Sequence, residues 1–345
     1  MKKIISFLNT DIKIINSYFL FTIVLIILVC VGYSSYALFS FTKTSTNIIE
    51  ATVGELKKSG ADTLIKLTDN KDNSGLYTIT HTKDSTLQIG NDKDITEYRY
   101  RGANPKNYVT FNNEVWRIIG VFKADDGTGN IENRIKLIKD QSIGNKFWDT
   151  GKSNNWARPA TLNTELNTTY LNSLDSTSQS MIGNAKYYLG GYHSDPDLID
   201  RIYQCERKIK NGYCSSYSAE CYYYGTNPNS WVGKLGLMYA SDYGYAASDE
   251  CTQSLYFYNN ATCKNNNWLF NSKDQWLMLQ FSMGNDIIFN VAWTGGVSFN
   301  DDSDGTYAMV NVFKYAVRPV LYLIPSVQIT GGDGTSSNPY IFGLK

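Results

Sequence analysis

The hydrophobic pattern of this chain begins with one long apolar run near the N-terminus. Residues 18–39 contain no charged side chain, and a helix of that length spans about 33 Å, enough to cross the hydrocarbon core of a bilayer. Three lysines and one aspartate lie within residues 1–17. The positive-inside rule therefore predicts a cytoplasmic tail at 1–17, a transmembrane helix or signal anchor at 18–39, and the rest of the chain outside the cell.

The fate of this apolar segment has two alternatives. Ser35 and Ala37 have the small-x-small spacing of a signal-peptidase site, so the segment is either cleaved or kept as an anchor. Its length favours the uncleaved anchor. A buried helix of a soluble protein is seldom apolar on every face. Cys30 lies within the run and is expected to be a membrane-buried thiol.

A polar stretch follows at residues 40–97. It is rich in Thr, Ser, Asp, Asn and Lys, with short apolar groups at 64–67, 76–79 and 87–89. This pattern predicts a polar stalk with short strands, and a disordered spacer is the alternative.

From residue 98 the pattern changes to short apolar strands separated by turns. The segments 115–122 and 315–323 are almost wholly apolar, so we expect both to be covered on both faces. We predict that they pair antiparallel and bury Trp116 and Leu321. Further strands are predicted at 108–111, 134–138, 231–238, 267–270, 275–278, 287–293 and 296–299, and the C-terminal tail 326–345 predicts one more hairpin.

Helical periodicity is confined to residues 159–212. Apolar side chains recur every four residues from Leu162 to Leu174, and a second stripe covers 181–189. A third helix is predicted to begin at Asp195-Pro196-Asp197, which combines an N-cap, a proline at the first helical position and acidic side chains in the first turn.

Composition narrows the classes of function. The net charge is zero and the isoelectric point is 6.7, whereas a nucleic-acid-binding protein needs a basic face. The 26 tyrosines and the low charged fraction of 19% are typical of extracellular proteins. His81 and His193 are the only histidines in the sequence.

An ordered set of short motifs runs along residues 98–325, none of them specific by itself: Asn104-Pro105-x-Asn107-Tyr108-Val109, Val115-Trp116-Arg117-Ile118-Ile119-Gly120-Val121, Trp148-Asp149, Asn154-Asn155-Trp156, Tyr188-Leu189-Gly190-Gly191, Gly236-Leu237-Met238-Tyr239-x-Ser241-Asp242-Tyr243-Gly244-Tyr245-Ala246 and Val317-Arg318-Pro319-Val320-Leu321-Tyr322-Leu323. This set resembles the C-type-lectin fold in its formylglycine-generating-enzyme (sulfatase-modifying factor) variant. More closely, it is similar to a family of bacterial surface proteins of unknown function built on that fold. The resemblance implies an α+β C-type-lectin-like domain over 98–325, in which the first and last strands pair. The segment 193–230 departs from the pattern and is interpreted as an insertion.

The resemblance also bears on catalysis. Enzymes of this fold include oxidases that use a cysteine pair late in the domain and iron enzymes that use three histidines. The sequence has two histidines and no cysteine after Trp268, so neither chemistry is expected and no cofactor is predicted. Arg318 lies in an apolar strand, where a buried guanidinium needs fixed partners, and it is predicted to bind carbonyls or a carboxylate within the domain.

Five cysteines follow the apolar segment, where an oxidising exterior permits disulfides. Cys251 and Cys263 flank an 11-residue loop and are the best pair. Among the other three, Cys205 is expected to bond to Cys214 or Cys221, which leaves one free thiol. A metal site is disfavoured, because neither a CxxC spacing nor a neighbouring histidine occurs.

Binding chemistry gathers on and beside the hairpin 287–299, on the face that lectin-like folds use. Aromatic rings with amide side chains suit sugars and protein loops, and the candidate ligand-binding residues are Asn290, Trp293, Phe299, Asn300, Tyr307 and Phe313. The alternative is that half of these are core residues.

The segment 300–305 resembles half of a calcium loop. Asn300, Asp302 and Asp304 alternate before Gly305, but the twelfth position is Asn311 instead of glutamate. A plain acidic turn is therefore favoured over a calcium site.

Three functions remain distinguishable from the sequence. The leading hypothesis is a non-catalytic, membrane-anchored extracellular domain that binds a surface glycan or protein and no nucleic acid. An oxidase or modifying enzyme of the formylglycine-generating type is the second. A structural protein of the cell envelope is the third.

Overall fold

The computed structural model describes residues 58–209, 223–303 and 305–344. These belong to one compact unit, which extends from Lys58 to Lys345. The predicted tail 1–17 and apolar segment 18–39 lie outside the described residues. Within the described ranges, no helix is both long enough and apolar enough to cross a bilayer.

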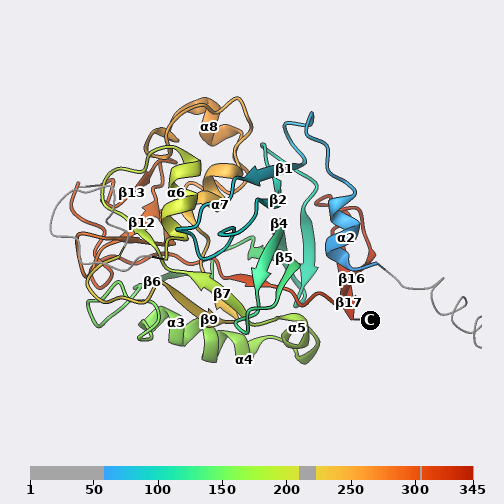
Figure 1. Ribbon diagram of the computed structural model, residues 1–345, viewed down its shortest axis with the longest axis horizontal. Coiled ribbons are helices and arrows are strands. Elements are labelled where there is room, and N and C mark those ends of the chain that lie inside the picture. Colours follow the sequence, from blue (N-terminus) through green and yellow to red (C-terminus); the bar gives the residue numbers. More distant parts are fainter. Residues whose placement is uncertain (1–57, 210–222, 304, 345) are drawn as a thin grey trace, which may run out of the picture. The chain divides into compact units, whose positions relative to one another are not determined.

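The unit has mixed α+β structure dominated by sheets, which confirms the predicted fold class at that level (Figure 1). Within the described residues the larger sheet has nine strands. They are β1 (Leu76–His81), β2 (Ile95–Tyr100), β3 (Tyr108–Phe111), β4 (Glu114–Asp125), β5 (Ile131–Lys139), β10 (Leu235–Gly236), β15 (Val320–Tyr322), β16 (Val327–Gly331) and β17 (Tyr340–Leu344). Seven follow the order β10-β15-β5-β4-β3-β17-β16, while β2 pairs with both β1 and β4.

A second sheet carries the hairpin on which the sequence placed its ligand-binding residues. Its strands are β6 (Asn145–Lys146), β8 (Gly191–Tyr192), β11 (Gln275–Phe281), β12 (Ile288–Val291), β13 (Val297–Ser298) and β14 (Tyr315–Ala316). The order is β13-β12-β11-β14-β6, and β8 adds to β11. A separate antiparallel pair joins β7 (Ala185–Tyr188) to β9 (Ser230–Gly233).

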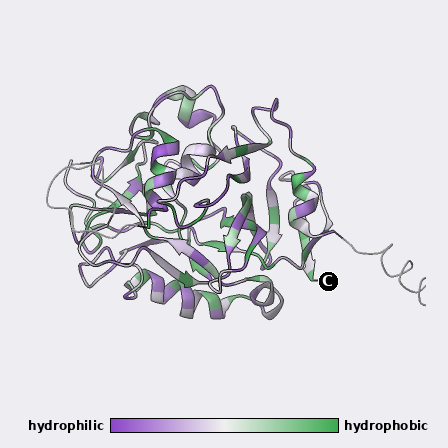
Figure 2. Ribbon diagram, in the orientation of Figure 1, coloured by the Kyte–Doolittle hydropathy of each residue, from purple (hydrophilic) through white to green (hydrophobic). Residues whose placement is uncertain are grey.

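Short helices fill the connections between strands. They are α2 (Gly60–Ile65), α3 (Thr161–Glu165), the π-helical turn η1 (Leu166–Tyr170), α4 (Leu171–Ser173), α5 (Ser176–Met181), α6 (Ile199–Glu206), α7 (Ala240–Tyr245), the 3₁₀ turn η2 (Leu255–Phe257) and α8 (Ala261–Asn265). In Figure 1, α3 to α5 run beneath β7 and β9, and α8 lies at the opposite end of the unit. Polar and apolar residues intermix along these helices and also along β4 and β5 (Figure 2).

The predicted pairing of segments 115–122 and 315–323 is wrong, although both are buried. β5 lies between them: Trp116 pairs with Lys139 of β5, and Leu137 of β5 pairs with Leu321 of β15. The physical reason is local. The carboxylate of Asp125 accepts two backbone N–H groups of the following turn, which closes a β4–β5 hairpin. The other edge of β4 is taken by β2 and β3, so β15 pairs with the far edge of β5.

Both ends of the compact unit extend beyond the predicted domain. The predicted stalk reaches residue 97, but β1 and β2 join the large sheet, where Tyr98 and Arg99 pair with Val121 and Gly120 of β4. A side chain at position 120 would meet the Tyr98 carbonyl, so glycine permits this close approach. The predicted C-terminal hairpin is present as β16–β17, and β17 adds to β3 in parallel.

The helix predictions had mixed outcomes. The stripe from Leu162 to Leu174 is helical through α3, η1 and α4, and α6 lies within the third predicted helix. The stripe at 181–189 is wrong, because β7 occupies 185–188 and pairs with β9. The predicted strand at 267–270 is also wrong, since Asn267 makes only isolated bridges. In both segments the apolar pattern is short enough to fit two periodicities, and contacts with a distant segment determine the structure that forms.

A network of buried charges ties the large sheet to two helices. The Arg99 guanidinium contacts Glu97 at 2.7 Å and Asp242 at 3.0 Å, and the Lys136 ammonium contacts Asp242 at 2.5 Å. Glu206 pairs with the Arg207 guanidinium at 2.7 Å. It also accepts hydrogen bonds from the backbone N–H and the hydroxyl of Ser241 in α7. Each charge has an opposite partner, as burial requires. Arg318 confirms its prediction, because its guanidinium donates to two backbone carbonyls.

Candidate ligand-binding site

The turn between β12 and β13 directs one tryptophan into solvent. Gly295 has φ of 110°, a conformation that favours glycine, and the turn is closed by hydrogen bonds between Ala292 and Gly295 and between Ala292 and Gly296. The N–H of Trp293 donates to Asp274 Oδ1 at 2.9 Å. With its backbone fixed in this way, the Trp293 side chain remains 54% exposed.

Trp293 lines a pocket of about 350 Å³ at one end of the smaller sheet. The other lining residues come from three further segments and are Asn145, Ser272, Lys273, Asp274, Lys314 and Tyr315. They converge because β14 pairs antiparallel with β6 and parallel with β11. The backbone N–H of Ala316 also donates to the carbonyl of Asp274, which joins two of the walls. The volume lies within the range of small-molecule sites.

A stack of aromatic rings holds the buried wall of this pocket. The Tyr315 ring packs on Trp276 with centroids 4.3 Å apart and on Phe313 at 5.7 Å. The Trp276 indole N–H donates to the carbonyl of Lys146, and the Tyr315 hydroxyl donates to Asp301 at 2.6 Å. Tyr315 is therefore a fixed and largely buried part of the pocket wall.

The charges around the pocket are mixed. Burial raises the pKa of Asp274, the N–H of Trp293 opposes that rise, and the nearby Asp301 and Asp302 carboxylates add to it. Lys273 is exposed. The Lys314 ammonium is also exposed and lies 4.7 Å from the ring centroid of Phe147. An amide, a half-buried carboxylate and two lysines therefore surround one exposed indole.

The six predicted ligand-binding residues do not form one site. Trp293 lines the pocket, and Phe313 supports it through Tyr315. Asn290 is fully buried, and its amide donates to the carbonyls of Ser298 and Asn300. These hydrogen bonds make Asn290 a structural residue that stabilises its own hairpin. Asn300 takes part in them only through its backbone carbonyl.

Phe299 and Tyr307 belong to a second aromatic group. Phe299 stacks on Phe281 with centroids 4.5 Å apart, and Tyr307 lies 6.0 Å from Phe299. Tyr307 is exposed, but neither residue lines the Trp293 pocket. The aromatic set predicted from sequence is thus divided between a pocket and a separate cluster.

The predicted disulfide between Cys251 and Cys263 is confirmed. The segment that it closes supports the Trp293 turn, because a side chain at position 296 would meet the carbonyl of Tyr256. The predicted bond of Cys205 is wrong: Cys205 is a free, buried thiol whose pKa burial raises to about 12. Its proposed partners at positions 214 and 221 lie outside the described residues.

The segment 300–305 behaves as an acidic turn in its described part. The Asp301 carboxylate accepts bonds from its own turn and from Tyr315, and Asp302 accepts from the Thr294 hydroxyl at 2.5 Å. Asp304 lies outside the described residues. Among the residues that the structure describes, no group of three or more His, Cys, Asp or Glu side chains is placed to hold a metal ion.

Sequence reasoning missed most of the pocket walls. Lys273, Asp274 and Tyr315 flank or begin strands that were predicted, so their ends could have been named as candidates. Nothing in the sequence indicated that Asn145 and Lys314 would join them, because that depends on the pairing of β14 with β6.

Comparisons of the chain with protein-family models, with curated proteins and with solved structures found no match.

Proposed function

We propose that this protein is a cell-surface protein that binds a glycan in the Trp293 pocket. The observation that carries the proposal is the exposed indole, which is held by its backbone bond to Asp274 and faces a pocket of sugar-like dimensions. Sugars present an apolar face of C–H groups and a rim of hydroxyls. An indole suits the first, and amide, carboxylate and ammonium groups suit the second.

The polar groups around the indole are suited to hydroxyl recognition. Asn145 offers both donors and an acceptor, Asp274 offers an acceptor, and the lysines offer donors. Asp274 Oδ2 accepts no hydrogen bond from the described residues, so it is available to a ligand hydroxyl. The two lysines further favour sugars that bear a carboxylate.

The setting is part of the same proposal. The apolar segment 18–39 would anchor the chain in the membrane with the compact unit outside the cell, and the resemblance to C-type-lectin-like surface domains supports a binding role. A disulfide between Cys251 and Cys263 is consistent with an oxidising exterior.

The experiment is glycan-array binding by full-length protein, followed by calorimetry with the best oligosaccharide. Trp293→Ala is expected to weaken binding by roughly tenfold or more, since stacking on an exposed ring is worth about 1–3 kcal/mol. Ile341→Ala is the control, because Ile341 is 52% exposed and lies outside both the pocket and the segment that supports the Trp293 turn.

Two results would overturn the proposal. One is an array without any saturable signal, which would favour a protein ligand or a structural role. The other is an equal loss of glycan binding in Trp293→Ala and Ile341→Ala, which would show that the effect is not local to the pocket.

A further inference from the structure

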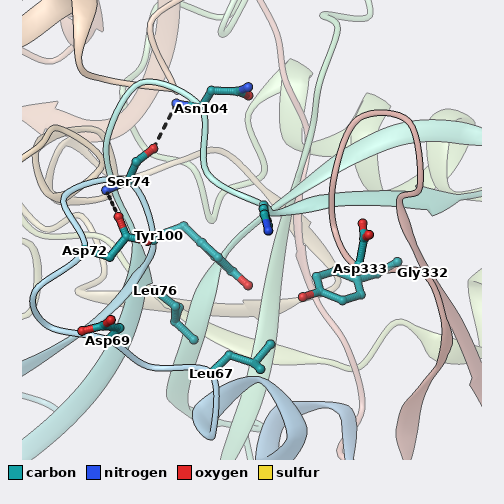
Figure 3. A pocket seen from close by; sticks show the side chains of 12 residues that line it. Leu67, Asp69, Asp72, Ser74, Leu76, Tyr100, Asn104, Gly332 and Asp333 are labelled. Atoms are coloured by element: carbon teal, nitrogen blue, oxygen red, sulfur yellow. Dashed lines mark hydrogen bonds between the residues drawn. The ribbon is translucent and has the colours of Figure 1, made fainter.

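Lys136 and Asp242 meet in the interior of the compact unit, although 106 residues separate them in the sequence. The Lys136 Nζ lies 2.5 Å from Asp242 Oδ2, and both side chains are completely inaccessible to solvent. Other carboxylates of the protein are open to water, among them Asp69 and Asp72, which line the cavity of about 640 Å³ in Figure 3. An amine and a carboxylate that are held in contact without water are the two reactants of an amide bond.

The backbone around each residue fixes its side chain at this contact. Lys136 lies on β5 and pairs with Gly120 of β4 on one side and with Tyr322 of β15 on the other. Asp242 lies in the first turn of α7, where its Oδ2 accepts the backbone N–H of Tyr239 at 2.9 Å. Because neither group has to be brought into place, most of the entropic barrier of a two-body reaction is absent. Such alignment corresponds to effective molarities of about 10⁵–10⁸ M in well-oriented intramolecular reactions.

Aromatic rings shield the pair from water. The Lys136 Nζ lies 4.3 Å from the ring centroid of Tyr239 and 5.3 Å from the ring centroids of Phe122 and Tyr322. Hydrolysis of an amide needs a water molecule at its carbonyl carbon. A site from which water is excluded therefore favours the amide over the separated amine and carboxylate.

The surrounding charges are balanced without this pair. Arg99 contacts Glu97 at 2.7 Å, and Arg207 contacts Glu206 at 2.7 Å. Loss of one positive and one negative charge from the lysine and the aspartate would leave these two ion pairs in place. Since desolvation penalises every buried ion, replacing two of them by a neutral amide is favourable.

Proton transfer within the pair gives the reactive forms. A nucleophilic amine must be uncharged, and burial lowers the pKa of Lys136 to about 8, with Asp242 opposing the shift. Burial also raises the pKa of Asp242, but the charges of Lys136 and Arg99 outweigh burial and lower it overall. Transfer of one proton from the ammonium to the carboxylate produces an amine and a carboxylic acid, and it removes the lysine charge that opposed protonation of the aspartate.

We infer that Lys136 and Asp242 form an intramolecular amide, which cross-links β5 to α7. The bond that forms joins Lys136 Nζ to Asp242 Cγ, and the bond that breaks joins Cγ to Oδ2. Two of the three ammonium protons leave with Oδ2 as one water molecule, so the reaction consumes no oxidant, reductant or cofactor. Arg99 donates to Asp242 Oδ1 at 3.0 Å and stabilises the negative charge that develops on this oxygen during the attack.

This cross-link has a structural consequence that the disulfide does not provide. A covalent bond between residues distant in sequence restricts the unfolded chain, as a disulfide does, but an amide is not broken by reductants. The large sheet and α7 are thus held together under any redox condition. The inference does not depend on the proposed glycan site, because neither residue lines the Trp293 pocket.

Peptide mapping of the full-length wild-type protein tests the inference. The protein is denatured, reduced, alkylated and digested with trypsin, which does not cut after an acylated lysine. The amide predicts a branched product in which residues 135–139 are joined to residues 235–264. Its mass should be lower by one water than the sum of the two peptides, and fragmentation should locate the junction at Lys136 and Asp242.

The same strand provides an internal control. The Lys139 ammonium contacts Glu114 at 2.8 Å, but the two side chains are 11% and 38% exposed. Lys139 should therefore remain unlinked and be cut by trypsin. Lys136→Arg is the matched variant, because it keeps the positive charge but has no primary amine, and the branched product should disappear.

Two results would overturn the inference. One is recovery of residues 235–264 from wild-type protein only as a free peptide. The other is as much branched product from Lys136→Arg as from wild type, which would place the linkage at another residue. The wild-type result stands even where Lys136→Arg folds poorly, and glycan binding affects neither reading.

Discussion

Charged residues gather in two regions of this molecule and are used in opposite ways. In the buried network, Arg99 and Lys136 converge on Asp242, whose side chain is completely inaccessible. In the cavity of Figure 3, which Asp69 and Asp72 line, both side chains are exposed, and Oδ2 of each accepts no hydrogen bond from the described residues. The first region is saturated by its own chain and the second is not.

A shifted pKa in the buried network has a structural cause. Burial lowers the pKa of Lys136 to about 8 even though Asp242 opposes the shift. A strongly shifted pKa often marks a functional site. Here it marks a lysine whose ammonium is enclosed by its partner and by the rings of Tyr239 and Phe122.

The largest effect is expected from breaking the buried network. Asp242→Ala would leave the charges of Arg99 and Lys136 without this partner in a site that water does not reach. The cost should be about 3–5 kcal/mol in the free energy of unfolding. Urea unfolding at pH 7 measures it, with Asp126→Ala, in the turn between β4 and β5, as the control. A loss below about 1 kcal/mol, the scale of surface pairs, would contradict the comparison.

Removing the disulfide should have the next largest effect. Replacing Cys251 and Cys263 by serine together is expected to cost about 3 kcal/mol by the loop-entropy relation. Because the enclosed segment contacts the Trp293 turn, glycan affinity should fall as well. Thermal unfolding with and without reductant provides the first measurement. An unchanged midpoint in wild-type protein after reduction would count against a stabilising role.

Acid should weaken the network through Glu97. Burial raises the pKa of this carboxyl, but the Arg99 charge and the bond with His81 outweigh burial and hold the pKa far below its usual value near 4.5. A lowered pKa contributes stability that is fully present above 4.5 and is lost as the pH falls toward the folded-state value. Glu206 acts in the opposite direction, because burial raises its pKa.

The contribution of Glu97 is isolated by comparing wild type with Glu97→Gln. The wild-type free energy of unfolding should fall by about 2 kcal/mol more than that of the variant between pH 6 and pH 3. Parallel pH profiles for the two proteins would show that Glu97 is not the titrating group.

Local sequence patterns predicted some elements well and their long-range arrangement poorly. The β12–β13 hairpin, the helix from Leu162 and the Cys251–Cys263 bond depend on neighbours within about a dozen residues, and all three are present. The partner of 315–323 was wrong, because an apolar strand can pair with any suitable edge.

The site was predicted in the same partial way. Trp293 was named because it is an aromatic residue on the hairpin 287–299, on the face that lectin-like folds use for binding, and the hairpin itself is a local signal. Asp274 and Tyr315 reach it only through the β11–β14 pairing. The cavity of Figure 3 was not predicted at all. Asp72 and Asp333, which both line it, are far apart in the sequence, and no periodicity of the sequence indicates that such residues lie close together.

The smallest effect on stability should come from Trp293, and this makes it the sharpest probe of the comparison. Its indole is 54% exposed, whereas Trp116 is wholly buried. Trp293→Ala should change the free energy of unfolding by no more than about 0.5 kcal/mol, as for surface positions, and Trp116→Ala should cost about 3–5 kcal/mol. Urea unfolding of both variants, run beside glycan binding of the first, gives the answer. If Trp293→Ala were as destabilising as Trp116→Ala, its ring would belong to the core, and the pocket would lose the residue that defines it as a binding site.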